Sequence, residues 1–299
     1  MYIFYNNNIL KQTVCASSMI CKELFLPMKF KDADIKVHVI SYGSCDAKKQ
    51  VLCLHGFASS GKVGYENVAK HMTGYNLVAI DWIGYGLSSK PLRKIDSYDE
   101  EYMVSFLKLF IEKAIKKKIL RERFSILATS MSGIAVALGH EWLEKYADTI
   151  VLVNPAGFDR RINIKFSLLL VNPLIRRDKF RKRISSRIMK GELFGWKEDQ
   201  KKRLAKLLDS DEFKVYLRTV KSAIRPRGRI RNTHRCRNPE KIKVPVMLIT
   251  SKKDSLFKWQ RYIRVAKTQK WKIVRVNYND HALLIYKPKE IAEATKKFI

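Results

Sequence analysis

Residues 123–133 read RFSILATSMSG, and this stretch decides the fold. A strand-like run, Arg123 to Thr129, leads into Ser130, and a helix-like run, Met131 to Tyr146, follows it. A turn from strand to helix pushes its central residue toward positive φ and brings the neighbouring backbones close together. The pattern therefore predicts a serine held on a sharp turn.

Such a turn requires small side chains two residues before and two residues after the serine. Ala128 and Ser132 meet this requirement, so the pattern G-x-S-x-G is present in relaxed form, with alanine and serine in place of the two glycines. A relaxed motif of this length is weak evidence by itself. Its weight depends on the rest of the chain.

Four other apolar runs also end in residues that can carry chemistry or shape a site. The runs and the residues after them are Gln50–Leu54 before His55-Gly56-Phe57, Asn76–Ile80 before Asp81 and a glycine turn, Val244–Thr250 before Asp254, and Trp271–Tyr278 before His281. Open α/β sheets build their sites at the carboxyl ends of strands. Ser130, Asp254 and His281 thus occur in the order nucleophile, acid, base.

With these ordered motifs the chain resembles the α/β-hydrolase family from about Glu23 to Ile299. The resemblance implies a Ser-His-Asp triad of Ser130, His281 and Asp254. It also implies an oxyanion hole formed by the backbone N–H groups of Phe57 and Met131. We expect no metal and no organic cofactor.

Other residues compete for two of these roles. The five remaining histidines lie in an early strand, before the glycine loop, on helices or in an arginine-rich stretch, which favours His281 as the base. Some members of the family carry the acid after an earlier strand, where this chain has Asn154 with Asp159 beyond it. Asp280 is interpreted as a loop residue, and Asp81 as a residue that holds its own turn.

The alternation of strand and helix patterns predicts an α/β protein with a mostly parallel sheet and helices on both faces. After the run Thr149–Val153 the periodic pattern changes for about eighty residues. By resemblance we expect this insertion to form a helical cap. The predicted organisation is an N-terminal extension (1–22), a first part of the hydrolase core (23–157), a basic helical cap (158–240) and a second part of the core (241–299).

The charge of the chain is strongly positive and unevenly distributed. The formal net charge is +32, and Arg160–Lys243 holds 27 Lys and Arg against 8 Asp and Glu, a net of +19. Such a surface attracts anionic membranes or other polyanions, although charge runs are also common as solvated helix faces. No nucleic-acid-binding motif accompanies the charge, so nucleic acid is not an expected partner.

The remaining features bear on location. The 5 cysteines lack metal-ligand spacing and are an odd number, which is typical of free thiols in a reducing compartment. No run reaches the ~20 apolar residues of a membrane-spanning helix. We therefore expect a cytoplasmic protein, with peripheral membrane association through the basic cap as an open possibility.

These observations predict a serine hydrolase that cleaves a carboxylic ester, with a lipid or acylglycerol among the candidates. Phe166–Val171 is either an acyl-pocket lining, a membrane-dipping segment or simply the core of the cap. Two alternatives stay open. One is a carbon–carbon bond hydrolase with the same triad, and the other is a non-catalytic member that binds a membrane or polyanion.

Overall fold

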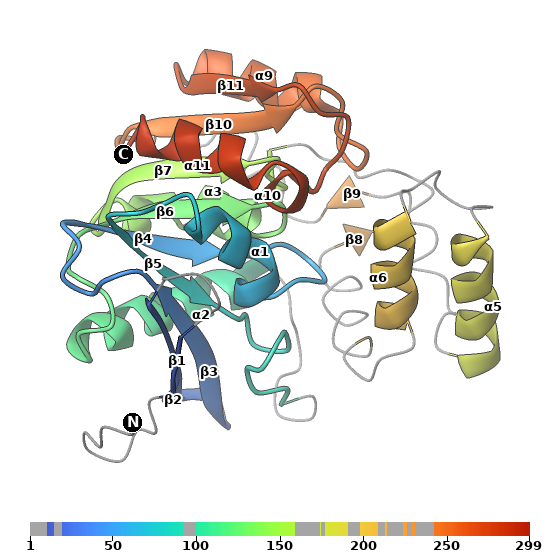
Figure 1. Ribbon diagram of the computed structural model, residues 1–299, viewed down its shortest axis with the longest axis horizontal. Helices are drawn as coiled ribbons and strands as arrows, with labels where there is room; N and C mark the ends of the chain where they lie inside the picture. The colour runs from blue at the N-terminus through green and yellow to red at the C-terminus, as the bar shows by residue number, and fades with distance from the viewer. Residues whose placement is uncertain are drawn as a thin grey trace.

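The structure is a computed structural model that describes residues 11–14, 20–91, 100–158, 177–190, 198–208 and 242–299, together with 174, 213, 224–225 and 229–230 (Figure 1). Its main strands are β1 (Lys11–Val14), β2 (Ile20–Phe30), β3 (Ala33–Tyr42), β4 (Lys49–Leu54), β5 (Tyr75–Ile80), β6 (Phe124–Thr129), β7 (Ala147–Val153), β10 (Val246–Ser251) and β11 (Lys272–Val276). Its helices are α1 (Gly61–Ala69), α2 (Glu100–Lys116), α3 (Ser132–Leu143), α5 (Asp178–Met189), α6 (Glu198–Leu208), α9 (Trp259–Thr268), α10 (Leu283–Tyr286) and α11 (Pro288–Lys296).

The main strands form one sheet in the order β1-β2-β3-β5-β4-β6-β7-β10-β11. Neighbouring strands are parallel along the part of the sheet that runs β5-β4-β6-β7-β10-β11. At the other end, β1, β2 and β3 add an antiparallel edge. From β4 the chain first adds β5 on one side and then β6 on the other. This reversal of direction places a topological switch point at the carboxyl ends of β4 and β6, where α/β folds bind their ligands.

Helices cover both faces of the sheet. On one face α1, α10 and α11 pack over a cluster that includes Tyr65, Val151 and Ile291. On the other face α2, α3 and α9 pack over the larger cluster, which includes Phe106 and Ile126. The central strands are therefore buried on both sides, which explains why their sequences are continuous apolar runs instead of alternating patterns.

The predicted α/β class, with a mostly parallel sheet and helices on both faces, is confirmed. The boundaries of β4, β6 and β10 lie within two residues of the apolar runs that predicted them. Ser60 begins α1 by accepting a hydrogen bond from the Val63 N–H at 3.2 Å. The short helix α10 was not predicted, because four residues are too few to produce a helical period.

The segments outside the α/β core are described only in part. Residues 11–14 form β1 on the edge of the main sheet, so part of the predicted N-terminal extension is a strand. The helices α5 and α6 pack against each other and lie, in Figure 1, on the side toward which β4 and β10 point. A small hairpin, β8 (Ile224–Arg225) with β9 (Arg229–Ile230), completes the described part of the insertion. The run Phe166–Val171 lies outside the described residues.

Two further observations concern the expectations about location. Cys45 is an exposed free thiol and Cys53 is a buried one. Among the helices that the structure describes, none is long and apolar enough to cross a membrane.

Candidate active site

Ser130 sits on the sharp turn between β6 and α3. Its φ is +49°, in the left-handed region that non-glycine residues seldom occupy. The turn is held on both sides, because the Ser130 N–H donates to the Val153 carbonyl at 3.1 Å and the Ser130 carbonyl accepts from the Ala156 N–H at 2.8 Å. A strained residue fixed by its surroundings in this way is a common feature of functional sites.

The close approach at this turn involves a residue that the sequence motif did not single out. Ala128 and Ser132 are both fully buried, in agreement with the need for small side chains. The tightest position is Gly133, where a Cβ would lie 2.6 Å from the Pro155 Cβ and from the Ala156 carbonyl oxygen. The glycine that this elbow needs for packing is therefore one residue later than the motif places it.

The structure brings together the three side chains that the sequence selected from distant positions. The His281 Nε2 lies 2.8 Å from the Ser130 Oγ, and the His281 Nδ1 lies 2.8 Å from the Asp254 Oδ2. Each of the three residues follows a different strand of the sheet (Figure 1). An imidazole that donates from Nδ1 to a carboxylate can accept a proton at Nε2, so this arrangement can activate a hydroxyl.

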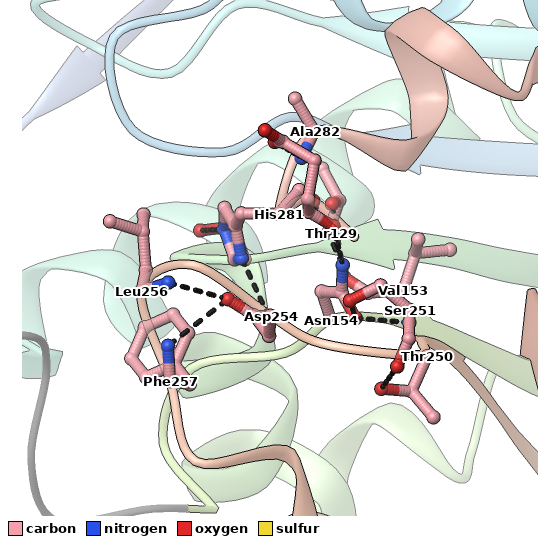
Figure 2. A network of polar contacts seen from close by, with 12 residues as sticks. Thr129, Val153, Asn154, Thr250, Ser251, Asp254, Leu256, Phe257, His281 and Ala282 are labelled. Carbon is pink, nitrogen blue, oxygen red and sulfur yellow. Dashed lines mark hydrogen bonds and ion pairs between the residues drawn. The ribbon is translucent and has the colours of Figure 1, made fainter. Parts of the chain in front are cut away.

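The Asp254 carboxylate is held by four hydrogen bonds. Its Oδ1 accepts from the backbone N–H groups of Leu256 and Phe257 at 2.7 and 3.0 Å (Figure 2). Its Oδ2 accepts from the Tyr262 hydroxyl at 2.6 Å as well as from His281. Burial would raise the pKa of Asp254, but the charge of His281 and these hydrogen bonds outweigh burial and lower it. The carboxylate therefore stays ionised.

The interaction between Asp254 and His281 shifts the pKa of His281 in the opposite direction. Burial would lower the pKa of the imidazole, but the charge of Asp254 and its hydrogen bond raise it, and Asp280 adds to the increase. The imidazolium that would form after proton transfer is thus stabilised. The neutral imidazole, which is the form that can accept a proton, predominates above this raised pKa.

Asn154 links the end of β10 to the loop that carries His281. Its side chain donates from Nδ2 to the His281 carbonyl at 2.9 Å and accepts at Oδ1 from the Ser251 N–H at 3.0 Å (Figure 2). Asn154 is fully buried and has a φ of +41°. It occupies the place of the alternative acid, but its side chain bonds to the backbone at Ser251, the last residue of β10, and at His281.

The loop after β4 lies directly against the nucleophile. A Cβ at Gly56 would lie 2.9 Å from the Ser130 Cβ, so only glycine fits there. The ring of His55 accepts from the Trp82 N–H at Nε2 (3.2 Å) and therefore donates from Nδ1 to the Gly56 carbonyl (2.7 Å). Burial lowers the pKa of His55 and keeps it neutral, despite the charge of Asp81. Phe57 follows in this loop, and Met131 follows Ser130.

Asp81 holds its own turn, as the sequence indicated. It is buried, and its carboxylate accepts from the backbone N–H groups of Gly61 at 2.6 Å and Leu87 at 2.8 Å. It also contacts the His38 ring at 2.8 Å. None of these partners is a member of the Ser130 cluster.

Two residues of the site were missed by the sequence analysis. Tyr262 lies eight residues after Asp254 on α9, where its sequence position is that of an ordinary core residue of an amphipathic helix. Asn154 is 127 residues away from His281 in the chain. The only sequence signal for Asn154 was its place at the end of a buried strand.

Comparison with known proteins agrees with this architecture. Lipase 1 from Psychrobacter immobilis is 28% identical over 113 residues, which are 38% of this chain and 33% of that protein. Probable lysophospholipase BODYGUARD 4 from Arabidopsis thaliana is 29% identical over 140 residues, 43% of this chain and 31% of that protein. The matches thus span about a third of the length of these curated relatives.

A solved serine hydrolase from Cycloclasticus zankles has the same fold. It superimposes with a TM-score of 0.69 at 14% identity, covering 93% of this chain and 97% of the other. The family model described as serine aminopeptidase, S33, matches residues 46–283, which is well over half of the chain. The chain therefore belongs to the serine aminopeptidase S33 family of α/β-hydrolases.

Proposed function

We propose that this protein is a serine hydrolase that cleaves a carboxylic ester through an acyl-enzyme, with Ser130 as nucleophile, His281 as base and Asp254 as the acid that orients it. The observation that carries the proposal is the pair of 2.8 Å contacts that join the three side chains. The raised pKa of His281 and the ionised Asp254 are what this chemistry requires.

We propose the following steps. The Ser130 Oγ attacks the ester carbonyl carbon while its proton moves to the His281 Nε2, which gives a tetrahedral oxyanion. The oxyanion accepts hydrogen bonds from the Phe57 and Met131 N–H groups. The intermediate collapses, and His281 gives its proton to the leaving alcohol. Water then attacks the acyl-enzyme by the same route, and the acid and free Ser130 are released.

The choice of an ester substrate is supported by the curated relatives, which are a lipase and a probable lysophospholipase. A serine nucleophile suits esters and thioesters, because an acyl-enzyme can form and then be hydrolysed. We therefore propose a small-molecule ester with an apolar acyl chain. Its length and its alcohol portion depend on a pocket that the insertion would help to form.

The exposed face of α5 supports peripheral binding to an anionic membrane as a further part of the proposal. Ile184 and Ile188 are buried, whereas the opposite face is exposed and basic. Its exposed cations are Lys179, Lys182, Arg183 and Arg187. A basic face of this kind attracts anionic lipid, and salt weakens the attraction. We expect the protein to sediment with phosphatidylserine vesicles at low salt and to be released as salt rises; no binding at low salt would reject membrane docking.

The central experiment is labelling of the purified protein with a fluorophosphonate probe, followed by hydrolysis of p-nitrophenyl esters from acetate to palmitate. We expect the wild-type protein to be labelled and Ser130→Ala not to be labelled, because the probe reacts only with an activated serine. Turnover should require Ser130, and the chain-length profile should define the acyl group. A folded wild-type protein that neither labels nor hydrolyses any ester would contradict the proposal.

The Tyr262→Phe variant tests how Asp254 controls His281. Removal of the hydroxyl leaves the Oδ2 with one donor fewer, so the carboxylate becomes more basic and raises the pKa of His281 further. Because the neutral imidazole is the active form, the acidic limb of the kcat/KM profile should move to higher pH. The lost hydrogen bond should lower the free energy of unfolding by about 1–3 kcal/mol. An unchanged pH profile would show that Tyr262 has only a structural role.

A further inference from the structure

Ser132 occupies the position where the elbow motif has its second glycine, and its hydroxyl makes two contacts that a glycine could not make. The residue is fully buried. The Ser132 Oγ donates to the His55 carbonyl at 2.5 Å and accepts from the Trp82 Nε1 at 3.0 Å. The same indole N–H lies 3.1 Å from the His55 carbonyl. The hydroxyl therefore ties the first turn of α3 to the residue that follows β4 and to the second residue after β5.

The contact with His55 acts on the loop that lies beside Ser130. We call residues 55–57 the oxyanion loop. Within it, the His55 carbonyl is held by Ser132 and Trp82, and the next carbonyl, that of Gly56, is held by the His55 ring at 2.7 Å. Since a peptide group is planar and trans, fixing the Gly56 carbonyl also fixes the direction of the Phe57 N–H. Two consecutive peptide planes are thus set.

The distance between this loop and the nucleophile leaves little room for movement. A Cβ at Gly56 would be 2.9 Å from the Ser130 Cβ. Ser132 lies two residues after Ser130, so its hydroxyl fixes the oxyanion loop against the same turn that carries the nucleophile. Donors held in place before reaction stabilise a developing oxyanion more than donors that must first reorganise.

We propose that the Ser132 hydroxyl is a positioning group that sets the Phe57 N–H relative to the Ser130 Oγ. In this chain, serine at the second glycine position strengthens the site instead of weakening it. The inference rests on the proposed hydrolase function. It assigns Ser132 a part in the reaction although Ser132 touches no substrate.

The test compares Ser132→Ala and Ser132→Gly with the wild-type protein, using the best p-nitrophenyl ester of the chain-length series. Alanine keeps the size of the side chain and removes only the hydroxyl. A misplaced oxyanion donor affects the transition state and not the bound ester, so kcat should fall about 10- to 100-fold while KM stays within about twofold. Affinity for a trifluoromethyl ketone, which forms an oxyanion adduct with the serine, should fall in parallel.

Ser125→Ala is the matched control. Ser125 is also a buried serine, and it accepts a hydrogen bond from the Thr149 hydroxyl at 2.9 Å near the start of β6, far along the strand from Ser130. The Ser125→Ala variant should lose stability, as Ser132→Ala does. It should nevertheless keep the wild-type kcat and the wild-type affinity for the trifluoromethyl ketone. A purely structural role for Ser132 would make the two variants alike.

The outcomes separate the two proposals. If the wild-type protein shows no hydrolysis that depends on Ser130, the proposed function fails. If it does, and Ser132→Ala or Ser132→Gly matches or exceeds the wild-type kcat and binds the ketone equally well, the positioning role of Ser132 is overturned. Should the alanine variant fail to fold, the glycine variant, which also removes the hydroxyl, gives the same comparison.

Discussion

His281→Ala is expected to lower kcat for an ester substrate by roughly 10⁵- to 10⁶-fold, with little change in KM. The Nε2 atom is the group 2.8 Å from the Ser130 hydroxyl that can take its proton, and a serine hydroxyl is a poor nucleophile without a base. The rate that remains would come from substrate binding and the oxyanion donors alone. Steady-state hydrolysis of a p-nitrophenyl ester, with active-site titration of the wild-type protein, measures this loss.

The pH dependence of kcat/KM tests the role of His281 in a second way. The pKa of His281 is raised by Asp254, and the base is neutral only above that pKa. Wild-type kcat/KM should therefore fall as the pH drops through a pKa that lies above the ordinary value for histidine, and the residual activity of His281→Ala should lack this limb. His71→Ala, at a half-buried site beyond the end of α1, is the control and should keep full activity. A His281→Ala variant with wild-type rates would reject the assignment of the base.

Asp254→Asn is expected to lower kcat by about 10⁴-fold. The structure indicates how the new amide would lie, because the Oδ1 position accepts from the Leu256 and Phe257 N–H groups and must stay an oxygen. The amide nitrogen would then replace Oδ2 and present its N–H to the His281 Nδ1. The imidazole would be forced into the opposite tautomer, which carries its proton on Nε2. This nitrogen could then not accept the proton of Ser130.

The neighbouring carboxylate gives the control for this variant. Asp280 adjoins His281, and its Oδ1 accepts from the Ala282 N–H at 2.8 Å. Asp280→Asn should keep most of the activity, and kcat of both variants would be measured on the same ester. If Asp280→Asn lost as much activity as Asp254→Asn, the acid would have to be reassigned.

The sequence predicted most of the core because its strands are buried on both faces. β4 and β10 are nearly continuous apolar runs, and such runs are distinct even without a period. The edge strand β1, with the sequence KQTV, has no such run and was not predicted. Within the insertion, where we expected a helical cap by resemblance, the described residues include the helices α5 and α6.

The residues of the site also fall into two groups, those that local sequence indicates and those that only the folded structure reveals. Ser130, Asp254 and His281 each follow an apolar run, so local sequence and chain order were enough to select them. Tyr262 and Asn154 depend on contacts that only the folded chain makes, and no local pattern marks them. For Ser132, the motif shows only that serine stands in place of a glycine, because its hydrogen bonds to His55 and Trp82 cannot be seen from the sequence.

The order of the strands also has a consequence for the newly made protein. The nucleophile and the oxyanion loop belong to the first half of the chain, whereas the acid and the base follow β10 and β11. Translation adds about 5–20 residues per second, so the 151 residues from Ser130 to His281 take roughly 8–30 s to synthesise. During that interval the nascent chain carries the elbow serine without a base. Reactivity should therefore appear only after β11 joins β10 and brings His281 to Ser130.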